Sequence, residues 1–238
     1  MFCDADDMFY NACGLYIIFD EMENGRFDCL FSTFIEETRD STTKEPVYIN
    51  RYMDTTFVHG KVHNRKFLLK NNIKWNENLQ IHEDSYFNCL CKTIAKELKY
   101  SSTSFYLWKW RDDSVCRHDD KYILKTYNNM LDSNDALVEE LLNRKYRADA
   151  ESYAVAMIYD AYFTMNKAEW LNQENKEYRN MVEHRFKEYW QKYKYLHDNM
   201  QEDIRNSIIV SLKNRMFTEG VILESITFNE WITQIENL

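Results

Sequence analysis

Residues 58–91 read VHGKVHNRKFLLKNNIKWNENLQIHEDSYFNCLC, and the succession of patterns in this stretch decides the fold. A short strand or turn is predicted over residues 57–62, followed by a helix over 65–71 that should end at Asn71–Asn72. From residue 85 to 98 the apolar residues recur at helical spacing, which predicts a longer amphipathic helix. Strand and helix signals therefore follow one another within a few dozen residues.

Further strands and a helix are predicted on either side of this stretch. Residues 28–34 (DCLFSTF) have the character of a buried strand, residues 47–49 fit a second, and residues 104–110 (SFYLWKW) alternate as a third. Residues 8–22 repeat apolar positions at helical spacing, so a helix is expected there. Met8, Phe9 and Tyr10, at its start, are interpreted as core residues.

The character of the chain changes near residue 120. Residues 120–217 are nearly all helix formers, and apolar residues such as Leu137 and Leu141 lie four positions apart. We expect three or four helices here. The sequence thus predicts two parts, residues 1–119 with mixed strand and helix and a helical region over residues 120–238.

The composition excludes several classes of protein. Of 238 residues, 45% are hydrophobic and 16% aromatic, so a buried core is expected and disorder is not. Four glycines and one proline are too few for a turn-rich all-β fold. The net charge of −9 argues against nucleic-acid binding, which relies on Lys and Arg to displace counterions. There is no long apolar run and no signal peptide, so we expect a cytoplasmic protein.

The cysteines are interpreted as free, mostly buried thiols of a reducing compartment. No His or Cys pair has the spacing that would complete a four-ligand zinc site. The six residues are Cys3, Cys13, Cys29, Cys89, Cys91 and Cys116.

Two groups of acidic residues could carry chemistry. Asp4, Asp6 and Asp7 follow an apolar segment that we interpret as the end of a strand, and carboxylates one residue apart can share a hard divalent cation. Glu83 and Asp84 precede the amphipathic helix, where the helix dipole favours an ionised carboxylate. Each group has a structural alternative, since the first could be a solvated turn that caps a helix and the second a helix cap.

Basic residues offer a second set of candidates, again with two interpretations. Gly60 permits close backbone approach, and Lys61 could face phosphate or simply solvent. Two arginines, a hydroxyl and an imidazole follow within one loop, where arginine forks suit diphosphate and histidine can complete a metal shell. Alternatively this is a surface loop whose arginines pair with neighbouring aspartates. The loop residues are Arg111, Ser114, Arg117 and His118.

One helical segment could contact a membrane or an acceptor. Residues 166–200 are rich in Lys, Arg, Tyr and Trp. Basic membrane helices carry a cleaner charge bias than this mixed segment, so a solvated helix is favoured over peripheral membrane association.

Taken in order, these pieces resemble the inverting family 2 glycosyltransferases of the GT-A type. The matching segments are FCDADDMFYN (2–11), DCLFSTF (28–34), residues 58–91 and FYLWKWRDDSVCR (105–117). In that family a strand ends in a D-x-D motif, a segment like hGKlyrrefLkknnikFnEnl follows, an E-D pair opens a helix, and an aromatic strand leads to an R-x-x-S-x-x-R loop. The resemblance covers residues 1 to 120 and implies an α/β fold, the C-terminal half of a GT-A domain.

The resemblance also implies roles for individual residues. Asp4 would contact the ribose or sugar of the donor and share with Asp6 a divalent metal, Mn²⁺ or Mg²⁺, with Asp7 beside it. Asp84 would be the general base, and Glu83 would position the base or the acceptor. The donor, expected to be a UDP-sugar, would be held by further residues of which the last also offers a metal ligand. These are Lys61, Arg111, Ser114, Arg117 and His118.

The implied activity is transfer of a sugar from a nucleotide diphosphate to a saccharide or lipid-linked acceptor, with inversion, at the cytosolic face of a membrane. Family members carry a βαβ nucleotide-binding segment before the D-x-D motif, and this chain has Asp4 almost at its start. A partner chain could supply that segment, or the chain could be a fragment. As an alternative, it could be an inactive remnant that serves as a binding or interaction module.

Overall fold

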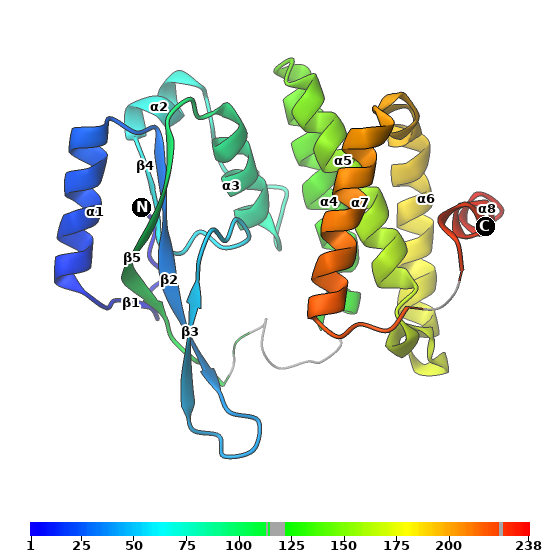
Figure 1. The fold of residues 1–238 in the computed structure, drawn as a ribbon, viewed down its shortest axis with the longest axis horizontal. Coiled ribbons are helices and arrows are strands. Elements are labelled where there is room, and N and C mark those ends of the chain that lie inside the picture. The colour runs from blue at the N-terminus through cyan, green and yellow to red at the C-terminus, as the bar shows by residue number, and fades with distance from the viewer. Residues whose placement is uncertain (113, 115–121, 224–225) are drawn as a thin grey trace. The chain divides into compact units, whose positions relative to one another are not determined.

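The computed structural model describes residues 1–112, 114, 122–223 and 226–238, the side chains of residues 122 and 123 excepted. The chain divides into two compact units, Met1–Asp120 and Lys121–Leu238. The first combines a sheet with helices and the second is helical (Figure 1). Among the described residues, no helix is long and apolar enough to cross a membrane.

The first unit is built on a mixed five-stranded sheet. The order β1-β5-β2-β3 runs along the sheet, and β4 also pairs with β2. β2 and β5 are parallel, whereas the other pairs are antiparallel. The strands are β1 (Met8–Phe9), β2 (Cys29–Arg39), β3 (Pro46–Arg51), β4 (Lys61–His63) and β5 (Leu98–Trp108).

Helices cover both faces of this sheet (Figure 1), α1 (Ala12–Gly25) on one face and α3 (Glu83–Ile94) on the other. A third helix, α2 (Arg65–Lys70), follows β4. Consecutive residues of a strand point to opposite faces. Leu30 of β2 accordingly packs with Ile18 of α1, whereas Cys29 approaches α3. The α/β class predicted for this part is confirmed.

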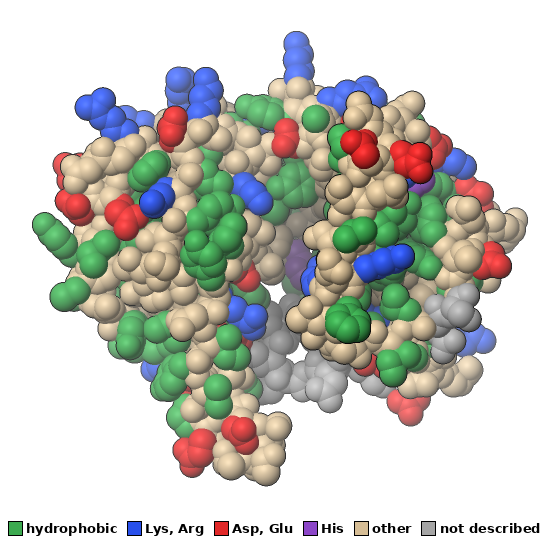
Figure 2. Space-filling view, viewed as in Figure 1, with side chains coloured by type: hydrophobic (Ala, Val, Ile, Leu, Met, Phe, Trp, Pro, Cys, Tyr) green, Lys and Arg blue, Asp and Glu red, His purple; other side chains and the backbone are tan. Residues whose placement is uncertain are grey.

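The start of α1 departs from the sequence-based prediction. The helix begins at Ala12 because the side chain of Asn11 accepts hydrogen bonds from the backbone N–H groups of Cys13 and Gly14. Met8 and Phe9 precede it as β1, which pairs with β5. The interpretation of Met8, Phe9 and Tyr10 as core residues is wrong, since the first two are 44% exposed and Tyr10 is 55% exposed. Figure 2 shows hydrophobic side chains at the surface of this part of the molecule.

The boundaries around α3 also shift. The helix was predicted over residues 85–98, but it begins at Glu83 and ends at Ile94. Leu98 already belongs to β5, which starts six residues before the predicted strand over 104–110. Asp84 therefore lies within the first turn of the helix instead of before it.

The second unit consists of packed helices. The prediction of three or four helices over residues 120–217 is confirmed for the described residues. They are α4 (Tyr122–Asn143), α5 (Arg147–Met165), α6 (Lys176–Asn199) and α7 (Glu202–Thr218), followed by α8 (Phe228–Glu236).

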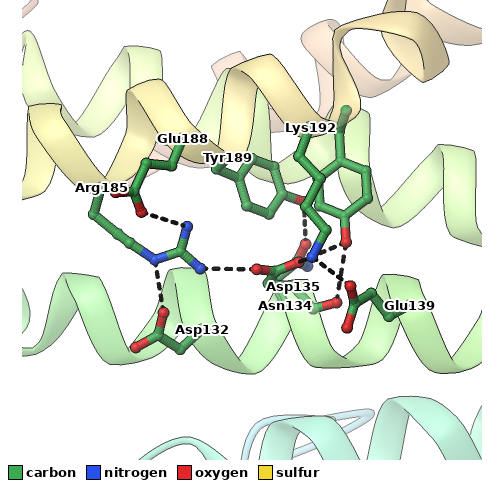
Figure 3. Close-up of polar contacts among 9 residues, drawn as sticks. Asp132, Asn134, Asp135, Glu139, Arg185, Glu188, Tyr189 and Lys192 are labelled. Carbon is green, nitrogen blue, oxygen red and sulfur yellow. Dashed lines mark hydrogen bonds and ion pairs between the residues drawn. The ribbon is translucent and has the colours of Figure 1, made fainter.

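A polar network joins α4 to α6 (Figure 3). Arg185 Nε lies 2.7 Å from Asp132 Oδ1, and a second nitrogen of its guanidinium lies 2.9 Å from Asp135 Oδ2. Lys192 Nζ is 2.6 Å from the other oxygen of Asp135. Beside them the aromatic side chain of Tyr189 is fully buried. Arg185, Tyr189 and Lys192 belong to the 166–200 segment, for which a membrane or acceptor surface is one interpretation. Their side chains instead pack and form ion pairs within the second unit.

Candidate functional site

The acidic residues near the start of the chain lie in a β-turn. The N–H of Asp7 donates to the carbonyl of Asp4 at 3.1 Å. Residues 1–4 lie in no strand, so the expectation of a strand ending at Asp4 is wrong. A turn, and not the end of a strand, therefore brings the carboxylates together.

Tyr106 fixes this turn to the end of β5. Its hydroxyl donates to Asp7 Oδ2 at 2.6 Å and accepts from the N–H of Asp4 at 3.2 Å. The N–H of Lys109 donates to the other oxygen of Asp7 at 3.0 Å. With these contacts the side chain of Asp7 is only 2% exposed. Burial and the neighbouring Asp7 raise the pKa of Tyr106, so the phenol keeps its proton at neutral pH.

His59 adds an imidazole to the two carboxylates. Its Nδ1 lies 3.9 Å from Asp7 Oδ2, and its ring stacks on Tyr106 with centroids 5.0 Å apart. The ring is buried, and Gly60 makes the turn into β4 with a φ of +68°. One ligand atom from each of Asp4, Asp7 and His59 lies within 4.8 Å of the others.

This donor set fits a hard or borderline divalent cation. Two carboxylates suit Mg²⁺ or Mn²⁺, and an imidazole is also acceptable to Mn²⁺. Burial raises the pKa of Asp4, and the charge of Asp6 raises it further. The pKa of Asp7 is likewise raised, chiefly by burial. A cation would relieve both effects because it favours the charged carboxylates.

Asp84, in the first turn of α3, contacts the residue that precedes His59 in the chain. Its Oδ2 accepts from the N–H of that residue, Val58, at 2.9 Å. Burial raises the pKa of Asp84 to about 6, and the charges of Glu83 and Asp4 add to the increase. The effect of Asp4 on Asp84 means that acidic groups eighty residues apart in sequence lie within electrostatic range.

The segment before β4 is held against α3 by side chains of the helix. Ser85 Oγ donates to the carbonyl of Thr56 at 3.3 Å, and Asn88 Nδ2 donates to the carbonyl of Phe57 at 2.9 Å. Asp84 completes the set through Val58. Its hydrogen bond to another segment is not that of a simple helix cap, which would bond to the N–H groups of its own first turn.

Asp6, expected to be a direct metal ligand, lies outside the group formed by Asp4, Asp7 and His59. Its carboxylate pairs with the guanidinium of Arg111, and both side chains are more than one third exposed. Arg111, expected at a diphosphate, is thus placed beside the acidic turn.

The remaining loop candidates are placed in part. Ser114 is half-buried, and its N–H donates to the carbonyl of Arg111 at 3.3 Å. Arg117 and His118 lie outside the described residues. The expected closing of this loop over a diphosphate stays a prediction.

Lys61 fits neither of its two sequence-based interpretations. Its side chain is buried, 1% exposed, so it faces neither solvent nor an open phosphate site. Nζ donates to the carbonyl of His59 at 3.1 Å and lies 5.6 and 5.4 Å from the ring centroids of Phe31 and Phe34. Burial lowers the pKa of Lys61 to about 8. Its charge acts through the interior, where it favours the ionised form of Asp84.

Glu83 is half-buried beside Asp84, and the structure gives it an electrostatic effect on that residue. Two members of the site, His59 and Tyr106, were not identified from sequence. His59 lies in the stretch 58–91, and Tyr106 lies in the aromatic strand. Neither carries a spacing signal, because their proximity to Asp7 arises only when β4 and β5 join the same sheet.

This chain matches no protein-family model and no curated protein.

Proposed function

We propose that this chain transfers a sugar from a nucleotide-diphosphate donor to a saccharide or lipid-linked acceptor, with inversion and with a divalent metal. The proposed fold is the C-terminal half of a GT-A domain. The observation that carries the proposal is the meeting of two carboxylate groups with separate tasks. Asp4 and Asp7, with His59, form the cation-binding group, and Asp84 is hydrogen-bonded to Val58, the neighbour of His59, with a pKa of about 6.

The two groups differ as the reaction requires. A bound divalent cation would neutralise the charge that develops on a leaving nucleoside diphosphate. The acceptor hydroxyl must lose its proton as it attacks, and Asp84 is the carboxylate available for that proton. A pKa near 6 leaves Asp84 mostly ionised at neutral pH yet more basic than an ordinary aspartate. The hydrogen bond from Val58 holds one oxygen and leaves the other for the acceptor.

The arrangement assigns supporting roles to neighbouring side chains. Tyr106 orients Asp7 and the backbone of Asp4, so it acts as a positioning residue for the cation. Arg111 lies beside the turn and suits the phosphate oxygens, for which it would exchange the carboxylate of Asp6. A nucleotide-binding βαβ segment, from a partner chain or a longer chain, would complete the donor site.

The proposal is tested by calorimetric titration of the full chain with Mn²⁺, and then with UDP or a UDP-sugar in saturating Mn²⁺. We expect Mn²⁺ to bind and UDP binding to require it. Asp7→Asn should lose both, whereas Asp20→Asn, an exposed aspartate of α1, should lose neither. If Mn²⁺ does not bind, the proposal is rejected. If Mn²⁺ binds but UDP and UDP-sugars do not, also after the nucleotide-binding segment is supplied by the longer chain or the partner chain, the transferase is rejected in favour of a binding module.

A further inference from the structure

A second group of ligand-type side chains lies on the α3 face of the sheet. Cys29 of β2 and His63 of β4 are directly opposite each other in the strand pair. Cys91 approaches them from α3, and one ligand atom from each residue lies within 4.8 Å of the others. All three residues are buried, and both cysteines are 0% exposed.

We propose that Cys29, His63 and Cys91 bind a Zn²⁺ ion that ties α3 to the sheet. The Sγ of Cys29 lies 3.4 Å from Nδ1 of His63. In a tetrahedral zinc site, bonds of about 2.3 Å to sulphur and about 2.05 Å to nitrogen place those two atoms about 3.6 Å apart. The side chains thus lie close to the spacing that an ion requires.

The surroundings of His63 also favour a ligand role. Its ring lies among the aromatic rings of Phe2, Phe31 and Phe87, at centroid distances of 6.2, 5.9 and 5.3 Å. Among the described residues, Nδ1 has only the sulphur of Cys29 as a hydrogen-bond partner. Burying an imidazole for one weak contact is unfavourable. A bond to a metal would offset that cost, and burial keeps the ring neutral, as a metal ligand must be.

The net charge of the site favours Zn²⁺ over other metal ions. Each bound Zn²⁺ displaces one proton from each of the two thiols, so two thiolates, a neutral imidazole and Zn²⁺ make a site of zero net charge. A neutral site is suited to an interior with no exposed ligand, where an unbalanced charge is costly. Cu⁺ would leave one negative charge there, and Mg²⁺ or Mn²⁺ prefers oxygen ligands. Three protein ligands leave the fourth position of the zinc for water or another small ligand.

The site would support α3 independently of any transferase activity. Cys91 follows Asp84 by seven residues on the same helix, a rise of about 10 Å. An ion bound to Cys91 and to two strands would fix the helix against the sheet. Its expected effect is therefore on stability, since the ion binds the folded state only.

Zinc content tests the proposal directly. The full chain, purified under reducing conditions and dialysed, should hold one zinc per chain by elemental mass spectrometry. Co²⁺ in place of zinc should give the thiolate-to-cobalt charge-transfer absorption of a site with sulphur ligands. Cys91→Ser and His63→Asn should lower zinc affinity at least 100-fold, whereas Cys13→Ser, at an exposed cysteine, should not change it.

If the variants do not fold, the wild-type chain alone tests the proposal. There, removal of zinc by a chelator should lower the melting temperature, and added Zn²⁺ but not Mg²⁺ should restore it. The proposal is overturned if the wild type binds no zinc and shows no cobalt absorption. It is equally overturned if peptide mapping finds Cys29 and Cys91 joined as a disulfide in the reduced-purified protein, or if Cys13→Ser loses the ion.

Discussion

The two ends of α3 face groups of opposite character. Near its start, Asp84 is hydrogen-bonded to Val58, which precedes His59 of the group with oxygen and nitrogen donors, and Asp4 of that group is exposed. Near its end, Cys91 faces a sulphur-rich group from which solvent is excluded. We expect an ion in the first group to exchange and to meet a substrate, and an ion in the second to hold α3 against the sheet. Accessibility, more than the number of ligands, separates a site for chemistry from a site for stability.

The largest expected effect follows from replacing Asp84. Asp84→Asn keeps an oxygen for the N–H of Val58 but removes the base, so turnover should fall about 10²–10⁴-fold. Donor binding should persist. Release of UDP from a UDP-sugar, with water or a saccharide as acceptor, measures the loss, and Asp20→Asn serves as the matched control. If Asp84→Asn has the turnover of the wild type, Asp84 is not the base. The difference in role between the two ends of α3 is then not supported.

Gly60 lies on the segment that joins the two groups, between His59 and β4. Its φ is +68°, and a Cβ there would lie 3.1 Å from Ser32 Oγ and 3.2 Å from the Cβ of Phe34. Gly60→Ala should therefore lower the free energy of unfolding by about 2–4 kcal/mol. Gly220 has a φ of +69° with nothing within 4 Å, so Gly220→Ala should cost only about 1–2 kcal/mol.

Urea unfolding of the two alanine variants separates crowding from backbone strain. The difference between them measures how tightly the segment before β4 is held against β2. Equal losses would show that the packing around Gly60 can relax, and that the spacing of the two ligand groups is not fixed by this turn.

Tyr106→Phe tests the group formed by Asp4, Asp7 and His59 separately from the group of Cys29, His63 and Cys91. The variant keeps the stacked ring but loses the hydroxyl that joins Asp7 to Asp4. Mn²⁺ affinity should fall about 10–100-fold, as is usual when a partner of a metal ligand is removed. Zinc retention should be unchanged, because Tyr106 is not one of the three residues Cys29, His63 and Cys91 that would bind the zinc. Calorimetry with Mn²⁺ and zinc analysis on the same sample measure both.

The α/β class and the helical second part could be predicted because they follow from local periodicity. Strands such as 28–34 and the helices after residue 120 carry their own signal in the spacing of apolar residues. Element ends were less predictable. Asn11 ends the strand-like segment and caps α1. This single capping side chain sets the start of the helix, although the apolar pattern predicts a helix from Met8.

The composition of the candidate sites depends on long-range pairing that the sequence does not express. Asp4, Asp7 and Asp84 were identified as candidates from their neighbours along the chain. His59 joins them only because β4 and β5 are brought into one sheet, and Cys29 meets His63 only through the β2–β4 register. The burial of Lys61 was missed for the same reason, since nothing adjacent to it in sequence predicts the rings of Phe31 and Phe34 around it.

A further expected effect concerns the pH dependence of stability. In the folded chain the pKa of Asp84 is raised to about 6, above its value of about 3.9 in the unfolded chain, mainly by burial. The folded state thus binds the proton of Asp84 more tightly than the unfolded state does. The stability that the protonated carboxyl contributes is fully present below pH 4 and is lost as the pH rises through 6. At pH 7 ionised Asp84 should destabilise the fold by about 2 kcal/mol, allowing for its partial exposure.

Asp84→Asn should accordingly match the wild type in stability near pH 4 and exceed it by about 2 kcal/mol at pH 7, as measured by urea unfolding at each pH. Mn²⁺ should reduce this difference, because a cation beside Asp4 favours the ionised carboxylate of Asp84. Zinc should raise the stability of both proteins equally and leave the difference as it was, since its site is neutral and about two helical turns away. If Asp84→Asn is instead less stable at pH 7, Asp84 is a structural residue of α3, and the contrast between the two ends of the helix disappears.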